Sequence, residues 1–114
     1  MPKSVTRSHS RYTKEAVTLL SRLIRVARIE RNLTAQEVAE RSCISRSMLQ
    51  RIEKGDLKCE IGAVFEVATI LGINLFNAEQ SSFTMAKNIR QTEERLTLLP
   101  QKVRKKTKVI NDDF

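Results

Sequence analysis

The sequence has few of the residues that interrupt helices and few aromatic ones. Its 114 residues include three glycines, two prolines and no tryptophan, and aromatic side chains make up 4%. Stretches of helix-forming residues therefore run with few breaks, which favours an all-α fold. A chain of this length forms one small domain with its ends rather than two domains.

Residues that most catalytic and metal sites need are also scarce. The single histidine is His9, near the start of the chain, and Cys43 and Cys59 form no C-x-x-C pair. Neither a zinc site nor a glycine-rich phosphate loop is therefore expected. Ser45 or Cys43 would lack a base if either served as a nucleophile. The sequence thus predicts neither an enzyme nor a cofactor.

The sequence contains no apolar run of the length that crosses a membrane and no cleavable signal pattern. Two unpaired cysteines are typical of a reducing compartment, where a Cys43–Cys59 disulfide would be an exception. We therefore expect a protein of the bacterial cytoplasm, associated with the nucleoid when bound to DNA and without a membrane partner.

The net charge of +8 is concentrated at the two ends of the chain. Residues 1–14 carry four basic and no acidic side chains, and residues 100–110 carry five basic and no acidic ones. Residues 15–99 are nearly neutral, with 12 basic and 11 acidic side chains. Basic ends suit a polyanionic partner and give salt-dependent affinity, although they also serve simply to keep a protein soluble.

The most informative stretch is LTAQEVAERSCISRSMLQRIEKG, residues 33–55. Thr34 and Glu37 have the spacing of a capping box, and Ser45 can cap a second helix in the same way. Gly55 can end that second helix in a left-handed conformation. Two short helices joined by a tight turn form a helix-turn-helix, whose second helix, about 45–54, enters the major groove of DNA.

Side chains on the outward face of this second helix are donors and amides, the types that bond base edges. We expect four of them to read bases: Arg46, Ser47, Gln50 and Arg51. Three others are candidate phosphate contacts: Ser45, Lys54 and Lys58.

Helices are also predicted on both sides of this motif. One spans about 14–31, and its inward face is Val17, Leu20, Ile24, Ala27 and Arg28. The other spans about 60–71, and its inward face is Ile61, Val64, Phe65, Ala68 and Leu71. Phe65 and Phe76 are expected in the core rather than as platforms for stacking bases.

The motif resembles the Xre/Cro repressor family over roughly residues 23–76, with Ala39 at the helix crossing and R-I-E-K-G closing the recognition helix. The resemblance implies a lambda-repressor-like fold of five helices and a structural ion pair between Arg28 and Glu53. Ala35 replaces the family's usual glutamine, so Gln36 would have to make that phosphate contact. Cys43 replaces the usual turn glycine, at a conformational cost of about 1 kcal/mol.

Four segments are expected: a disordered basic arm (1–12), the helix-turn-helix domain (13–76), a C-terminal helix (77–99) and a flexible charged tail (100–114). In the third segment, heptad-like spacing predicts a helix over about 78–98, ended by Pro100. Its apolar seam either folds back on the domain or pairs with a second subunit, and two-fold DNA recognition favours the homodimer. The seam residues are Met85, Ile89, Thr92, Leu96 and Leu99.

A second resemblance, to HipB-like antitoxins, rests on E-I-G-A-V-F-E-V-A (60–68), L-L-P-Q-K-V-R (98–104) and N-D-D-F (111–114). It implies an autorepressor of a toxin–antitoxin operon that binds an inverted-repeat operator as a dimer and partners a HipA-type toxin kinase. Two alternatives stay open: a stand-alone Xre-family regulator, and a component that mainly holds the toxin kinase, for example through Phe114. An RNA-binding module is less supported because no aromatic stacking surface is visible.

Overall fold

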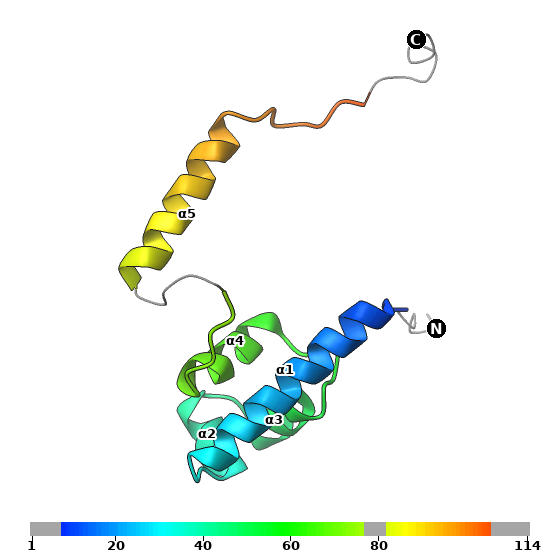
Figure 1. Cartoon of the computed structure of the whole chain (residues 1–114), viewed down its shortest axis with the longest axis vertical. Helices are drawn as coiled ribbons and strands as arrows, with labels where there is room; N and C mark the ends of the chain where they lie inside the picture. Colours follow the sequence, from blue (N-terminus) through cyan, green and yellow to red (C-terminus); the bar gives the residue numbers. More distant parts are fainter. Residues whose placement is uncertain (1–7, 77–81, 106–114) are drawn as a thin grey trace. The chain divides into compact units, whose positions relative to one another are not determined.

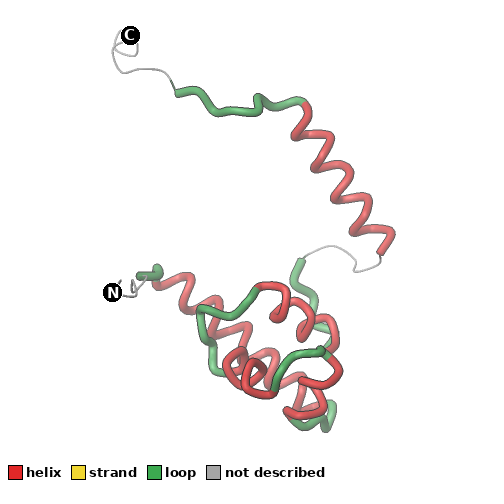
Figure 2. The backbone as a smooth tube through the Cα atoms, turned by 180° about the vertical axis from the view of Figure 1, so that it is seen from behind, coloured by secondary structure: helices red, strands yellow, loops and turns green. Residues whose placement is uncertain are grey.

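The computed structural model describes residues 8–76 and 82–105, and these ranges contain five α-helices and no strand (Figures 1 and 2). The all-α, five-helix prediction is therefore confirmed for this part of the chain. The first seven residues of the expected arm, residues 77–81 and the end of the expected tail (106–114) lie outside the described residues.

The helices belong to two compact units. The first unit holds α1 (Arg11–Glu30), α2 (Ala35–Arg41), α3 (Arg46–Glu53) and α4 (Ile61–Ile70), and the second holds α5 (Ser82–Thr97). Figure 1 labels α1 to α4 within the first unit, where α3 packs against both α2 and α1.

One apolar core joins the helices of the first unit. Each helix contributes at least one side chain with no exposed surface: Ile24 from α1, Val38 from α2, Leu49 from α3 and Val67 from α4. Burying a side chain of this size stabilises the fold by about 1.5–3 kcal/mol. The core therefore fixes the position of α3 relative to the other three helices.

The predicted caps of α2 and α3 are confirmed. The Thr34 hydroxyl accepts from the Glu37 N–H at 3.1 Å, and the Glu37 carboxylate accepts from the Thr34 N–H at 2.8 Å. The hydrogen bond from the Thr34 backbone N–H lowers the pKa of Glu37. The Ser45 hydroxyl accepts from the Met48 N–H at 3.0 Å, and Gly55 follows α3 with a φ of 80°.

The start of α1 corrects the predicted boundary of the arm. The helix begins at Arg11, not near residue 14, so residues 11 and 12 are helical rather than part of a disordered segment. Ser10 caps it by accepting from the Thr13 N–H at 3.1 Å, and Arg11 pairs with Glu15 one turn later at 3.3 Å. The predicted start was too late because it rested on the spacing of apolar residues, and the first turn of α1 is held by polar contacts instead.

The face that α4 turns to the core also differs from the prediction. Ile61, Phe65 and Phe76 were expected in the core, but their exposed fractions are 74%, 38% and 53%. The predicted inward residues Ala68 and Leu71 are buried and Val64 packs against the core, and Val67, which was not predicted, is buried as well. The helix is rotated so that these positions face α1 to α3, which leaves Ile61 and Phe65 beyond the edge of the buried face.

Helix α5 presents its predicted seam to solvent. Ile89 and Leu96 are 52% and 62% exposed, and the Thr92 hydroxyl donates to the Asn88 carbonyl of its own helix at 2.8 Å. Met85 is partly buried, whereas Leu99 lies beyond the last helical residue, Thr97. The expectation that Leu99 continues the helical seam was therefore wrong. In the described ranges, no helix is long and apolar enough to cross a membrane.

Candidate nucleic-acid interface

Helix α3 has one buried and one exposed face. Leu49, Ile52 and Glu53 are buried, whereas the opposite face is exposed over most of its length. Because the buried side is fixed by the core, the exposed side is a rigid row of polar groups. Three of the four predicted base readers, Arg46, Ser47 and Gln50, lie on this exposed side. None of the three makes a side-chain hydrogen bond within the described part of the chain.

Arg28 and Glu53 anchor α3 to α1. The Arg28 Nε and Nη2 atoms donate to the two Glu53 carboxylate oxygens at 2.6 and 3.1 Å, and Nη1 donates to the Leu33 carbonyl at 3.0 Å. The two side chains are only 15% and 10% exposed. The hydrogen bond to Glu53 raises the pKa of Arg28. The structure thus gives both residues a positioning role behind the exposed face.

Arg51 has an intramolecular partner that the sequence pattern did not indicate. Its Nε donates to the Asp56 carboxylate at 2.8 Å, and the other carboxylate oxygen of Asp56 accepts from the Lys58 N–H at 2.8 Å. These hydrogen bonds, first that from the Lys58 backbone and then that from Arg51, lower the pKa of Asp56. Arg51 is therefore held toward the loop that follows α3, unlike the other predicted base readers.

The residues that form this arrangement of α1 to α4 match a known protein family. A family model described as helix-turn-helix matches residues 24–76. Residues 24–76 form a helix-turn-helix domain of the Xre/Cro type. A search of curated proteins found no match. The domain supports a DNA-binding regulator of transcription, and it contains the last seven residues of α1 and all of α2, α3 and α4.

The predicted phosphate contacts of the helix-turn-helix domain fall into two groups. Lys54 and Lys58 are exposed and make no side-chain hydrogen bond in the described ranges. Gln36, by contrast, donates its amide to the Glu40 carboxylate at 3.0 Å. The Ser45 hydroxyl already serves as the α3 cap. The structure therefore leaves the two lysines most free to meet a phosphate.

An open depression lies where α1, α2 and α3 meet in the helix-turn-helix domain. The Arg28–Glu53 pair forms part of its lining, and the remaining lining residues are Arg25, Ala35, Gln50 and Lys54. Sequence reasoning did not single out Arg25. Its position in the sequence could have indicated this place, because Arg25 comes three residues before Arg28. Side chains three residues apart lie next to each other on the surface of a helix such as α1.

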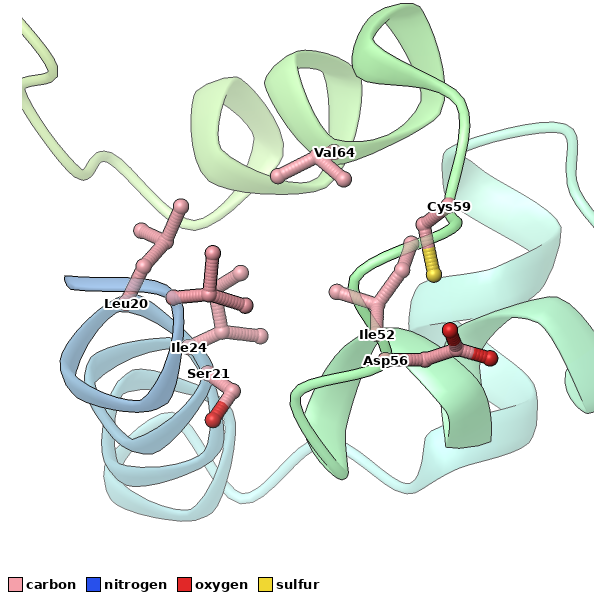
Figure 3. Close-up of a pocket in the computed structure, with 8 residues that line it drawn as sticks. Leu20, Ser21, Ile24, Ile52, Asp56, Cys59 and Val64 are labelled. Atoms are coloured by element: carbon pink, nitrogen blue, oxygen red, sulfur yellow. The ribbon is translucent and has the colours of Figure 1, made fainter. Parts of the chain in front are cut away.

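A second cavity lies behind α3, among α1, α4 and the loop between α3 and α4 (Figure 3). Its lining is largely apolar, with Ile24, Ile52 and Val64 beside Cys59 and the Asp56 carboxylate. The volume of about 30 Å³ has room for water but not for a cofactor.

The two cysteines of the domain are not bonded to each other. Cys43 lies in the turn between α2 and α3 with a φ of 57°, the left-handed conformation that was predicted at this position. Burial raises the pKa of the Cys59 thiol. Within residues 8–76 and 82–105, no group of three or more His, Cys, Asp or Glu side chains is arranged to hold a metal ion.

Proposed function

We propose that the protein is a sequence-specific repressor that binds an inverted-repeat operator as a homodimer. One observation carries the proposal: the exposed, unpaired Arg46, Ser47 and Gln50 lie on a helix whose opposite face is locked into the core. A helix presented in this way can enter the major groove without reorganising, and each well-formed bidentate base contact contributes about 1–3 kcal/mol of discrimination. Repression is then steric, because the bound dimer covers a promoter that overlaps the operator.

The roles of the polar residues follow from their contacts. Arg46, Ser47 and Gln50 read bases, because their side chains have no competing partner. Arg51 reads a base only through the guanidinium nitrogens that Asp56 does not engage, since its Nε is occupied. Lys54 and Lys58 hold backbone phosphates, because both side chains are exposed and unpaired in the described part of the chain.

The homodimer rests on α5. Ile89 and Leu96 are more than half exposed and lie on one side of the helix together with Met85. An apolar stripe of this kind is stabilised when a second copy covers it. A two-fold dimer also matches two half-sites one or more helical turns apart.

A binding titration tests the repressor function. The purified protein is titrated against the DNA upstream of its own gene and against a scrambled sequence, at two salt concentrations, and the stoichiometry of the complex is measured. We expect tight binding to the upstream fragment by two subunits. The Gln50→Ala variant should lose sequence preference, whereas Gln91→Ala, the same change on exposed α5, should not. Equal binding of both DNA fragments by the unaltered protein would refute sequence-specific repression.

We further propose that the repressor is the antitoxin of a toxin–antitoxin operon in the bacterial cytoplasm and binds a HipA-type kinase. The supporting observation is that Ile61 and Phe65, which belong to the stretch resembling HipB-like antitoxins, are exposed rather than buried. The test is co-purification with a kinase encoded beside its gene. Ile61→Ser should weaken that complex without changing operator binding. A regulator with no kinase gene in its operon would be a stand-alone Xre-type repressor instead.

A further inference from the structure

Helix α1 has a second apolar face, separate from the one that it turns to the core. The residues of this face recur at intervals of four, three, four and three, which is the spacing of a coiled-coil seam. The four larger side chains have exposed fractions between 46% and 79%, and the small one is exposed as well. This α1 seam consists of Tyr12, Ala16, Leu19, Leu23 and Val26. A regular apolar surface of this kind marks an interaction site.

The α1 seam lies away from the α3 surface proposed to meet DNA. Because an α-helix turns by about 100° per residue, side chains two residues apart lie on nearly opposite sides of it. Arg25, which lines the depression beside α3, is two residues from Leu23 in the seam. Ile24 and Ala27 face the core. A partner on the α1 seam therefore leaves α3 accessible.

The first turns of α1 receive little support from the rest of the first unit. From Arg11 to Ala16, every residue except Thr13 is exposed. Figures 1 and 2 show this end of α1 projecting beyond the other helices of the unit. Helical turns without tertiary packing are marginally stable in water. A second helix along the seam would stabilise them, and the projecting end leaves room for it.

One border of the α1 seam carries charges of opposite sign. Glu15 and Arg22 are seven residues apart, so they lie on the same side of the helix, and each comes one residue before a member of the seam. Glu15 accepts from Arg11 at 3.3 Å in a pair that is 67% and 89% exposed. The Arg22 Nη1 donates to the Ser21 hydroxyl at 3.2 Å. Exposed contacts of this kind are weak, so both charges can take a new partner.

We infer that the α1 seam pairs in an antiparallel arrangement with the α1 seam of a second copy of the chain. Tyr12 of each copy faces Leu23 of the other. The small Ala16 faces Leu19, so large and small side chains alternate along the contact. Two-fold symmetry makes each of these contacts twice.

The charges at the border select this register. Glu15 of one copy lies beside Arg22 of the second copy, and symmetry forms the ion pair twice. If one helix slid by seven residues, Leu19 would face Leu23 and the two Arg22 side chains would meet. Like charges at this border position oppose that register, so the complementary one is favoured.

The contact is short and therefore weak. An interface of this size associates only transiently, so dilute protein keeps the assembly state that α5 sets in the proposed homodimer. Two dimers on neighbouring operators differ, because binding to one DNA raises their local concentration to roughly millimolar. There the α1 contact makes binding cooperative. This consequence rests on the proposed function, whereas the contact itself does not.

Sedimentation equilibrium of the full chain without DNA tests the contact. Between about 10 μM and about 1 mM, where small interfaces associate, the weight-average mass should rise at least about twofold. Leu19→Asp should abolish this rise because it places a charge in the seam. Ile29→Asp makes the same change at a similarly exposed site of α1, 54% against 61%, but outside the paired segment. It should leave the rise intact, and circular dichroism should show both variants folded.

Exchanging the border charges tests the register. Glu15→Arg alone places two arginines together, and Arg22→Glu alone places two glutamates together. Each should lower the association constant about fivefold or more. The double variant with both changes restores opposite charges and should associate like the unaltered protein.

Tyr12 provides a second readout without a label. It is the only tyrosine of the chain, which has no tryptophan, so the intrinsic fluorescence of the protein comes from the α1 seam. Its side chain is 79% exposed in the single copy. Quenching by acrylamide should therefore decrease as the protein concentration rises, and it should stay constant in Leu19→Asp.

Two results would overturn the inference. One is a constant mass up to the highest concentration. The other is a rise that Glu15→Arg leaves unchanged; if Ile89→Asp abolished that rise, the α5 stripe of another copy would be the occupant of the seam. Neither result involves DNA, so both are distinct from a failure of specific operator binding, which would overturn the proposed function.

Discussion

Breaking the Arg28–Glu53 pair should unfold the helix-turn-helix domain at a much lower temperature. Glu53→Ala removes both carboxylate hydrogen bonds from the Arg28 guanidinium, whose side chain is only 15% exposed in the intact pair. Each hydrogen bond to a charged group contributes about 1.5–3 kcal/mol. A stranded buried charge of this kind costs about 3–5 kcal/mol in total. For a domain of this size, a loss of 3 kcal/mol lowers the melting temperature by roughly 12 °C or more.

The assay is thermal and urea unfolding followed by circular dichroism, with a second ion pair as the control. Arg11 and Glu15 form an exposed pair on α1, with side chains 89% and 67% exposed. Glu15→Ala should therefore cost less than about 0.5 kcal/mol. The double variant Arg28→Met with Glu53→Leu should be more stable than Glu53→Ala, because it leaves no unpaired charge. If Glu53→Ala were as mild as Glu15→Ala, the pair would not anchor α3 as the structure indicates.

Three further perturbations test other parts of the structure. Leu49→Ala should lower the free energy of unfolding by about 2–5 kcal/mol in urea titration, since the side chain is fully buried, and a loss below 1 kcal/mol would contradict the packing. The pKa of Glu37 is lowered in the folded state, so its stabilising effect is complete above its ordinary pKa and is lost as the pH falls through the lowered value. The free energy of unfolding of Glu37→Gln should therefore fall less steeply with decreasing pH than that of the unaltered protein. An unchanged dependence on pH would show that the capping contact of Glu37 does not cause the loss of stability in acid. Ile89→Asp, which places a charge on the exposed stripe of α5, should convert a dimer to a monomer in analytical ultracentrifugation, whereas a retained dimer would exclude α5 as the interface.

Features set by neighbouring residues could be predicted from the sequence. The capping box of Thr34 and Glu37 and the cap at Ser45 depend on contacts within a few residues, and both are present. The sequence pattern is informative here because the physical partners lie within one helical turn of each other. The left-handed Cys43 and the Arg28–Glu53 pair were implied by the resemblance to the Xre/Cro family, and both are present too.

Features that depend on the rotation or meeting of helices could not be predicted in this way. Helix α4 (Ile61–Ile70) is apolar over most of its ten residues, so only Glu66 and Thr69 marked the solvent side and the exposure of Phe65 was missed. The Arg51–Asp56 pair depends on the path of the loop after α3. The place of Arg25 in the lining of the depression between α1, α2 and α3 follows only once the positions of three helices are known.

The left-handed turn residue before α3 also makes the protein convenient to label. Cys43 is exposed at this turn, whereas Cys59 is partly covered and burial raises its pKa, which keeps more of it in the unreactive thiol form at neutral pH. A maleimide dye should therefore attach preferentially at residue 43, a few residues from the start of the reading helix. Fluorescence from that single position would follow docking on DNA in real time without any engineered cysteine.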